Sequence, residues 1–180
     1  MKILILNGNP DVQNRSFDEQ LAKLSEILER THPVSLKKLR ELTIKHCIGC
    51  YSCWLKTPGV CFFKDDCAPV LREYINSDFV LYASPVVLEY ISSRLKAAID
   101  RLILPSALPF LTMRDNLIQH PLRYQKMPAT ALILGKTKDY SPTDPEVIDS
   151  MFRRNRTRRF RFIKVLEDNV KEIADEINNN

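Results

Sequence analysis

The sequence predicts a single α/β domain with a central parallel sheet covered by helices on both faces. Short apolar runs alternate along the chain with longer segments whose apolar residues recur at helical spacing. The apolar runs are continuous rather than alternating, which is typical of strands buried on both faces of a parallel sheet. A length of 180 residues with 44% hydrophobic and 27% charged residues fits one globular domain over residues 1–180.

The first elements are a strand, a helix and a second strand. Residues 2–6, KILIL, form a short buried strand, and the turn-forming stretch 7–16, NGNPDVQNRS, follows it. Ser16 then opens an amphipathic helix, with Glu19 completing a capping box. The expected core face of this helix is Phe17, Leu21, Leu24, Ile27 and Leu28. Residues 33–37, PVSLK, are expected to form the second strand.

The middle of the chain alternates helix and strand in the same way. The stretch 64–75, KDDCAPVLREYI, predicts a helix with an Asp cap and Pro69 in its first turn. Residues 79–83, FVLYA, are an apolar strand that ends at a Ser-Pro pair. Residues 90–103 read as a helix with Ile91, Leu95, Ile99 and Leu102 inward. Residues 129–134, ATALIL, form the fourth strand and end at a glycine.

The remaining segments are less regular. Residues 104–127 form a long connection rich in apolar residues, and loops of that length are usually functional, such as a lid or an interface. The chain from Pro145 onward is expected to be helical. Residues 159–165, RFRFIKV, alternate and could instead form a strand. The expected core face of the last helix is Val165, Leu166, Val170, Ile173 and Ile177.

Composition indicates a cytoplasmic protein that does not enter a membrane. The N-terminus MKILILNGNP has too short an apolar stretch for a signal peptide, and no apolar run approaches the length that spans a bilayer. Five cysteines are an odd number for a disulfide framework. We therefore expect cysteines that are catalytic or bind metal rather than disulfides.

The net charge of +5 comes from one segment. The stretch RRNRTRRFRFIK, residues 153–164, carries six Arg, one Lys and no acid, so the rest of the chain sums to −2. One interpretation is a docking patch for an anionic partner such as nucleic acid, a cofactor phosphate or an acidic redox protein. We favour the other, a solvated face balanced by the acids that follow, so nucleic acid is not the expected partner.

The most specific chemical motif is the stretch CIGCYSCWLKTPGVC. It holds Cys47, Cys50, Cys53 and Cys61 at the spacing C-x2-C-x2-C-x7-C. Thiolates at such spacing favour an iron–sulfur cluster, with Cys61 returned as a fourth ligand by the Pro-Gly turn before it. Two alternatives stay open, a set of redox or packing thiols without metal and a zinc site. Cys67 in the next helix is expected to be a buried apolar residue.

Three motifs in order resemble one family. The run DFVLYASPVVLEYISSRLKAAIDRL resembles the signature D-x-apolar-S-P-V-Y-F-x-x-V-S-x-x-L-K-x-x-I-D-R of the NADPH-dependent FMN reductases. The opening ILILNGNPDVQNRS resembles the strand and phosphate loop of that family, and CIGCYSCWLKTPGVCFFKDD resembles the cysteine motif of its iron–sulfur flavoprotein branch. The resemblance covers residues 2–135 and implies a flavodoxin-like fold, a three-layer sandwich around a central parallel sheet.

The resemblance also implies which residues bind FMN. The FMN phosphate would be met by Asn9, Asn14, Ser16 and Phe17. The flavin ring and ribityl chain would lie along Pro85, Val86, Val87 and Leu88, and the third side would be closed by Gly135, Lys136 and Thr137.

Three positions depart from the family pattern. Val87 stands where the family usually has Tyr, Glu89 where it often has Gly, and Asp11 where it usually has Arg. The first departure removes an aromatic packing partner, and the other two bring negative charge toward the cofactor. A protein that has lost FMN is the alternative that these departures raise.

The resemblance implies an oxidoreductase in which FMN takes electrons from NAD(P)H. The acceptor would be a flavin, a quinone or a protein, and the protein would be a homodimer or homotetramer. An alternative is an iron–sulfur flavoprotein electron carrier with a [4Fe-4S] cluster on Cys47, Cys50, Cys53 and Cys61. A second alternative is a binding module without FMN. No side chain stands out as a general acid or base, so no catalytic residue is predicted.

Overall fold

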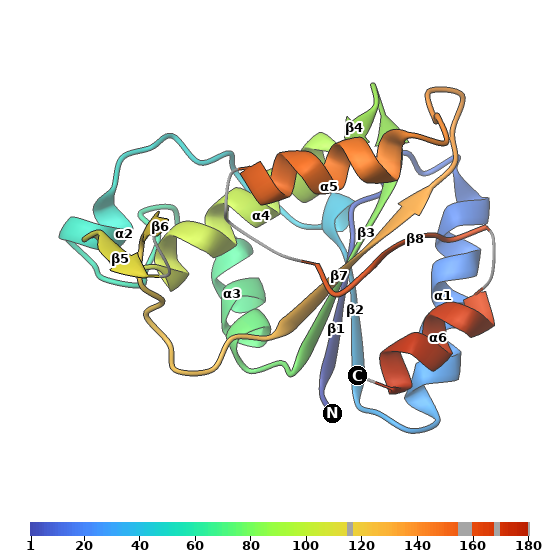
Figure 1. The fold of residues 1–180 in the computed structure, drawn as a ribbon, viewed down its shortest axis with the longest axis horizontal. Coiled ribbons are helices and arrows are strands. Elements are labelled where there is room, and N and C mark those ends of the chain that lie inside the picture. The colour runs from blue at the N-terminus through green and yellow to red at the C-terminus, as the bar shows by residue number, and fades with distance from the viewer. Residues whose placement is uncertain (115–116, 155–159, 168–169, 180) are drawn as a thin grey trace.

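The computed structural model describes residues 1–114, 117–154, 160–167 and 170–179. Within these residues the central sheet has six strands, five of them in the order β2–β1–β3–β7–β8 and a sixth, short one paired with β3 (Figure 1). All four pairings along this order are parallel. The five strands in this order are β1 (Ile3–Asn7), β2 (Val34–Lys38), β3 (Phe79–Val87), β7 (Ala129–Gly135) and β8 (Ile163–Val165). This is the flavodoxin-like strand order, so the predicted fold class is confirmed.

Helices cover both faces of the sheet and complete the three layers (Figure 1). One face carries α1 (Arg15–Glu29) and α6 (Val170–Asn178), and the other carries α3 (Cys67–Ile75), α4 (Ser93–Ser106) and α5 (Asp144–Arg154). Successive residues of a strand point to opposite faces, so Ile3 and Ile5 pack toward α1 while Leu4 and Leu6 pack toward α3 and α4. The continuous apolar runs of the sequence are explained by this burial on both sides.

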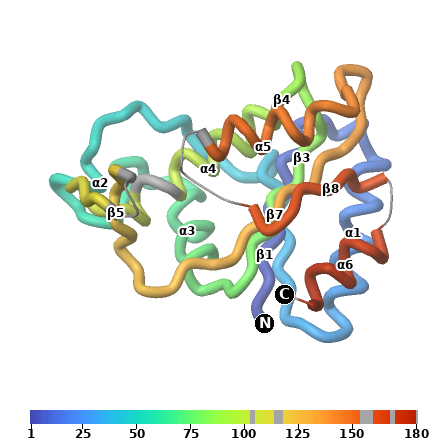
Figure 2. The backbone as a smooth tube through the Cα atoms, in the orientation of Figure 1, coloured from blue at the N-terminus to red at the C-terminus, as the bar shows by residue number. Residues whose placement is uncertain are grey.

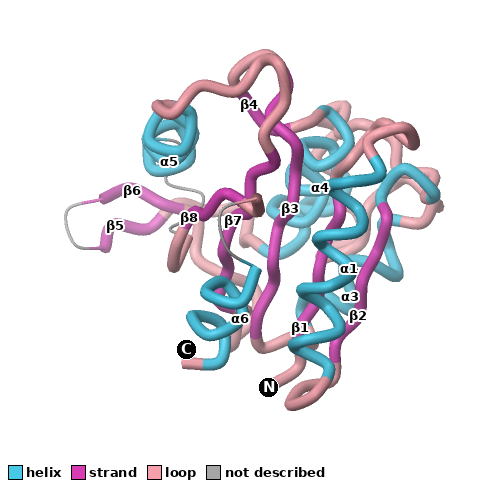
Figure 3. Tube along the Cα trace, turned by 90° about the vertical axis from the view of Figure 1, so that its right-hand side faces the viewer, coloured by secondary structure: helices cyan, strands magenta, loops and turns pink. Residues whose placement is uncertain are grey.

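Short elements connect these layers. A 3-10 helix, η1 (Leu39–Glu41), follows β2, and β4 (Tyr90–Ile91) pairs antiparallel with the end of β3. A separate lobe holds α2 (Ser52–Leu55) and the hairpin of β5 (Thr112–Arg114) with β6 (Leu117–Gln119). Figure 3 shows this hairpin projecting away from the central sheet. In Figure 2, the start of β1 and the end of α6 lie at the end of the sheet opposite β4.

Helix α1 begins one residue earlier than predicted. Its cap is Asn14, whose side-chain Oδ1 accepts a hydrogen bond of 3.4 Å from the N–H of Phe17. Ser16 lies inside the first turn and accepts a bond from Gln20 instead. The predicted capping box on Ser16 is therefore wrong, because an Asn two residues upstream reaches the free N–H groups of the helix first.

The prediction that the third strand ends at its Ser-Pro pair is also wrong. Strand β3 continues through Pro85 to Val87 and turns back into β4. The next helix begins at Ser93, three residues later than predicted, because Tyr90 and Ile91 form β4. The helix is capped by Ser92, whose Oγ accepts a bond of 3.2 Å from the N–H of Leu95.

The C-terminal region contains a strand where a continuous helix was expected. Residues 163–165 form β8, so the alternating reading of RFRFIKV is the correct one. Val165 and Leu166 are buried as predicted, but they belong to β8 and the turn after it rather than to the last helix. Similarly, the long connection 104–127 contains the end of α4 and the β5–β6 hairpin.

The Arg-rich segment lies partly outside the described residues, at 155–159. The described cations include Arg153, which is 2.5 Å from Asp149, and Lys164, whose Nζ is 2.6 Å from Glu172. These pairs agree with the interpretation of a solvated, charge-balanced face for the part that the structure describes.

Candidate functional site

Three loops meet at the carboxyl edge of the sheet, and direct hydrogen bonds tie them together. After β1, the N–H of Gly8 donates to the carbonyl of Ala83 at 2.7 Å. The hydroxyl of Ser92, after β4, donates to the carbonyl of Gly8 at 2.5 Å. The hydroxyl of Thr137, after β7, donates to the carbonyl of Val86 at 2.7 Å. The edge is therefore one connected structure rather than three independent loops.

Gly8 allows this edge to pack closely on α4. A Cβ placed on Gly8 would lie 2.6 Å from the Cβ of Leu95 and 3.1 Å from the carbonyl oxygen of Ala83. Neither the helix nor the strand can move without disturbing the core, so only glycine fits here. The sequence shows one glycine in this loop, and the close approach explains why it is needed.

The first loop is shaped by Asn9, which is fully buried. Its amide nitrogen donates to the carbonyl of Asn14 at 3.0 Å and to the carboxylate of Asp18 at 3.1 Å. Its amide oxygen accepts from the N–H of Asp11 at 3.1 Å. All of these partners lie in the loop or in α1, so Asn9 fixes the path of the chain around the site.

An ion pair between Arg40 and Asp18 stabilises this loop. Arg40, in η1, donates to Asp18 at 2.5 Å and also reaches the carbonyl of Asn9 at 3.4 Å. Burial would raise the pKa of Asp18, but hydrogen bonds from Arg40 and from the side chains of Asn7 and Asn9 outweigh burial and hold this pKa below its ordinary value. Sequence reasoning missed Arg40 and Asp18, whose pairing requires the fold to bring η1 beside α1.

The Asp18–Arg40 ion pair also affects the negative charge that Asp11 is expected to bring toward the cofactor. Arg40 has its pKa raised by the hydrogen bond and charge of Asp18 and, more weakly, by the charge of Asp11. Arg15, at the exposed start of α1, adds a second positive charge to the same loop. The N-terminus of the fifteen-residue helix α1 also adds a favourable dipole for an anion.

The residues that the resemblance assigns to the phosphate lie in different environments. Ser16 is exposed at the start of α1, and Asn14 is half-buried as its cap. Phe17 is only 2% exposed and packs against Gly135, where an added Cβ would lie 2.3 Å from the ring. Ser16 and Asn14 therefore line the edge, whereas Phe17 and Gly135 fasten α1 to β7 beneath it.

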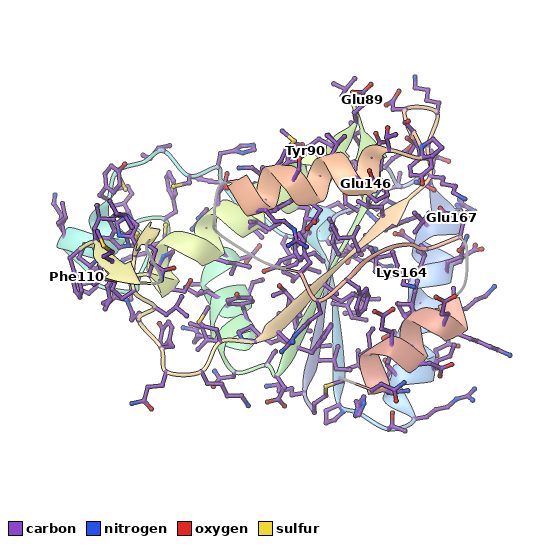
Figure 4. All side chains as sticks on the ribbon, viewed as in Figure 1. Glu89, Tyr90, Phe110, Glu146, Lys164 and Glu167 are labelled. Carbon is purple, nitrogen blue, oxygen red and sulfur yellow. The ribbon has the colours of Figure 1, made fainter. Side chains whose placement is uncertain are left out.

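The β3–β4 turn forms the second side of the edge. Pro85 and Val86 are buried in the sheet, Val87 is half-buried and Leu88 is 82% exposed. Leu88 and Glu89 have φ values of 49° and 58°, so both central residues of this hairpin are left-handed, as in a type I′ turn. Figure 4 shows Glu89 at the tip of the turn. Glycine or asparagine is the usual choice here, and side chains in this conformation store strain of about 1–2 kcal/mol each.

The third loop lies beside this turn. Lys136 is exposed, and its Nζ lies 5.8 Å from the centre of the Tyr140 ring. Thr137 bonds to the backbone of β3, as described above, and its Oγ1 also accepts from the N–H of Asp139 at 3.1 Å. The carboxylate of Asp139 lies 3.5 Å from the N–H of Leu88. The second and third loops are therefore joined through Thr137 and Asp139.

The four cysteines of the motif line one pocket in the separate lobe. The wall of this pocket also includes Ile48, Phe62, Phe63 and Arg101. Cys47 and Cys50 are exposed, Cys61 is half-buried and Cys53 is buried. All five cysteines of the chain are free thiols in the structure. The fold thus brings together the four residues that the sequence selected as ligands.

The thiols differ in their electrostatic surroundings. Burial raises the pKa of Cys53, with further contributions from the charges of the other three cysteines of the motif. Hydrogen bonds from the backbone and hydroxyl of Ser52 lower the pKa of Cys50. Burial raises the pKa of Cys67, outside the motif, to about 11, which fits its predicted role as a buried apolar residue.

The base of the cysteine loop is closed by a buried ion pair that sequence reasoning missed. Asp65 accepts from the N–H of Lys45 at 3.1 Å and from the N–H of Cys67 at 3.1 Å. Arg101 of α4 donates to Asp65 at 2.5 Å and to the carbonyl of Lys45 at 3.2 Å. Arg101 therefore holds both ends of the loop against α4. Its only sequence signal was the final Arg of the helix signature.

The donor set of the pocket consists of four thiols, and thiolates are the ligands of iron–sulfur clusters. In the residues that the structure describes, no three His, Cys, Asp or Glu side chains converge closely enough to hold one metal ion. A buried arginine, Arg101, lies in the wall of the same pocket and adds a positive charge beside the thiols. Within the same described ranges, no helix is long and apolar enough to cross a bilayer.

Comparisons with known proteins agree with the geometry. Residues 1–119 match the family model of NADPH-dependent FMN reductases. Two iron–sulfur flavoproteins of Methanocaldococcus jannaschii are 28% and 30% identical over 101 residues, and one of Archaeoglobus fulgidus is 29% identical over 103 residues. These alignments cover 56–57% of this chain and 46–51% of the relatives. The chain thus spans about half the length of the curated relatives it matches.

Solved structures resemble the whole chain. An azoreductase from Bacillus anthracis superposes with a TM-score of 0.64 at 12% identity, covering all of both chains. An FMN-dependent NADH-azoreductase of Bacillus anthracis, in complex with FMN, superposes with a TM-score of 0.59 at 14% identity, covering 99% of each chain. At such identities the likeness shows the fold alone.

The Asp18–Arg40 pair predicts a specific acid dependence of stability. The pKa of Asp18 is lower in the folded protein than in the unfolded chain, where it is about 3.9. The stability that ionised Asp18 contributes is therefore fully present above the unfolded pKa and is lost as pH falls through the folded pKa. Asp18→Asn should lower the free energy of unfolding by about 1–3 kcal/mol at pH 7 and by much less at pH 3. Urea denaturation across this range measures both values, with exposed Asp175→Asn as the control. An equal loss at pH 3 and pH 7 would contradict this role.

Proposed function

The chain belongs to the NADPH-dependent FMN reductase family, and on that premise we propose that it is an FMN-dependent oxidoreductase. It would take electrons from NAD(P)H and pass them to a flavin, a quinone or a protein acceptor. The observation that carries the proposal is the set of three loops joined by hydrogen bonds at the carboxyl edge of the sheet. Ligands of open α/β sheets bind at this edge, where the strand order reverses.

The start of α1 would bind the FMN phosphate. Ser16 and Arg15 are exposed there, and Asn14 caps the helix beside them. Asn9 would act through the loop, because its own donors already bond to Asn14 and Asp18. The positive charge of Arg40, which interacts chiefly with Asp18 and more weakly with Asp11, would offset part of the repulsion between Asp11 and the phosphate.

The β3–β4 turn and the loop after β7 would hold the rest of the cofactor. Pro85, Val86, Val87 and Leu88 would follow the ribityl chain and the ring, with Gly135, Lys136 and Thr137 on the other side. FMN, when bound, supplies the hydride and electron chemistry. The chain supplies the phosphate contacts, the orientation of the ring and the exclusion of water. The exposed Leu88 offers an apolar contact where Val87 lacks the usual aromatic ring.

The cysteine pocket favours a second candidate, an electron carrier that combines FMN with a [4Fe-4S] cluster. Cys47, Cys50, Cys53 and Cys61 would be the ligands, and the cluster would supply one-electron transfer. The support is the shared pocket together with the similarity to iron–sulfur flavoproteins. A protein acceptor would suit this candidate, whereas a quinone or free flavin would suit the reductase.

We further propose a homodimer or homotetramer in the cytoplasm. Five free thiols support a reducing compartment. The lobe that holds α2 and the β5–β6 hairpin exposes many large apolar side chains, including Leu55, Phe62, Phe110, Met113 and Ile118. Figure 4 shows Phe110 in this lobe, at the far end of the molecule from Lys164 and Glu167. Apolar surface of this kind is typical of an interface.

The flavin proposal predicts FMN binding and FMN-dependent oxidation of NADPH or NADH. FMN binding should quench flavin fluorescence. The absorbance of NADPH or NADH at about 340 nm should fall as the holoprotein oxidises it after a quinone is added. Arg40→Met should raise the Kd for FMN about tenfold, or about 1.4 kcal/mol, because it leaves Asp18 without its cation. The exposed Arg30→Met is the matched control. A colourless protein that takes up no FMN would instead indicate the binding module.

The cluster candidate predicts about four irons and four sulfides per chain after anaerobic purification or reconstitution. Cys53→Ser should abolish the broad brown absorbance, because this buried thiol lies in the pocket with the other three. Cys67→Ser provides the control, since Cys67 is outside the set of pocket-lining residues. Equal iron content in wild type and Cys53→Ser would contradict the assignment of ligands.

The proposed oligomer predicts a mass above that of one chain in light scattering coupled to size-exclusion chromatography. Met113→Glu combined with Ile118→Glu should shift the protein toward monomer, because these side chains face each other across the hairpin and are 73% and 59% exposed. The far-UV circular dichroism spectrum should stay unchanged. Wild type that elutes as a monomer would contradict the proposed state.

A further inference from the structure

Among the side chains that the structure describes, Arg101 is the largest that is fully buried, with 1% of its surface exposed. It lies on α4, in the wall of the pocket lined by the four motif cysteines. An arginine is rarely buried so completely unless all of its donors have partners. The partners of Arg101 therefore indicate what the pocket is built to receive.

In the described residues, the hydrogen bonds of good geometry from the guanidinium come from Nη1, and the Cys61 thiol lies near enough to help Asp65 raise the pKa of Arg101. Nη1 donates to the carboxylate of Asp65 and to the carbonyl of Lys45. The Phe63 ring covers the guanidinium at 5.4 Å from its central carbon. Nε and Nη2 are buried and have no hydrogen-bond partner in the described part of the chain. Together these two groups form the fork through which arginine binds acceptors in pairs.

An empty donor fork is expensive in a folded protein. A buried N–H group without a partner has lost its hydrogen bonds to water and gained none in the protein. The carboxylate of Asp65 is already used by Nη1 and by the backbone of Lys45 and Cys67. The polar side chains that line the same pocket are the four cysteines of the motif and Tyr51. An anion bound by those thiols would place acceptors beside the fork.

We propose that Arg101 is a positioning residue for an anionic iron–sulfur cluster, to whose sulfur atoms the Nε–Nη2 fork donates two N–H···S hydrogen bonds. The inference rests on the cluster candidate described above. A cluster with four thiolates has net negative charge, and one with a buried cation beside it is easier to reduce. Hydrogen bonds to its sulfur atoms act in the same direction. Arg101 thereby raises the midpoint potential and retains the cluster in the pocket.

The test compares wild type, Arg101→Lys and Arg101→Met after anaerobic reconstitution with ferrous iron and sulfide. Lysine keeps the charge but lacks the planar fork, and methionine lacks both. Exposed Arg94→Met, on the same helix, is the matched control. The readouts are the rate of iron loss to a chelator and the midpoint potential from a spectroscopic redox titration. Neither readout depends on turnover.

Arg101→Met should lose iron at least ten times faster than wild type. Its remaining clusters should be at least tenfold harder to reduce, which corresponds to a shift of about 59 mV to more negative potential for one electron. Arg101→Lys should fall between the two, and Arg94→Met should match wild type. A purely structural role for Arg101 would lower iron content but would leave the potential of the remaining clusters unchanged.

Loss of Arg101 also leaves the buried Asp65 carboxylate without its cation, which could unfold the lobe. The double variant Arg101→Met with Asp65→Asn removes that charge and keeps an acceptor for the backbone of Lys45. FMN binding and far-UV circular dichroism report whether the sheet is intact. Because Asp65→Asn also removes a negative charge beside the pocket, the double variant should show a smaller shift to negative potential than Arg101→Met, from the loss of the N–H···S hydrogen bonds.

Two failures can be told apart. Wild type that binds no iron would overturn the cluster candidate and the role of Arg101 with it. Wild type with a full cluster, whose potential and iron loss are the same in Arg101→Met, would overturn the role of Arg101 alone.

Discussion

Parallel pairing of β1, β3 and β7 is the constraint from which the rest of the structure follows. The register aligns Asn7 with Ala83 and Ser84 with Leu134, so the three strands end at the same edge. Parallel strands cannot be joined by tight hairpins, and each connection must cross back over a face of the sheet. The first residues after each strand therefore collect at one edge, where backbone and hydroxyl groups join them. A slip of one residue in this register would turn the buried side chains of a strand to the opposite face.

Helix α4 connects this edge with the cysteine pocket. Near its start, the Ser92 cap and Leu95 pack on Gly8 of the first loop. Six residues after Leu95, or about 9 Å along a helix axis, Arg101 holds both ends of the cysteine loop. One rigid element therefore positions the candidate flavin site with its first turns and the candidate cluster site with its later turns. Rigid elements of this kind give functional groups more precise positions than loops do.

Much of the fold could be predicted because the strands are continuous apolar runs and the helices have clear periodicity. The cysteines could be selected as a group because three of them stand two residues apart, and the fold gathers all four around one pocket. The cap at Asn14 and the strand at 163–165 were missed or left open because each has a local competitor with a similar signal. No local sequence pattern indicates the ion pairs Asp18–Arg40 and Asp65–Arg101, because their partners lie 22 and 36 positions apart in the chain. Charged residues are usually exposed, and only the tertiary structure reveals which of them are buried.

The central claim is that the three joined loops at the carboxyl edge bind FMN. The most direct measurement is a crystal structure of the protein grown with FMN. The account predicts density for the phosphate at the first turn of α1, near Ser16, and for the ring between the β3–β4 turn and residues 135–137. Density for FMN at another position, or a site that stays empty while the same solution shows no binding, would contradict it.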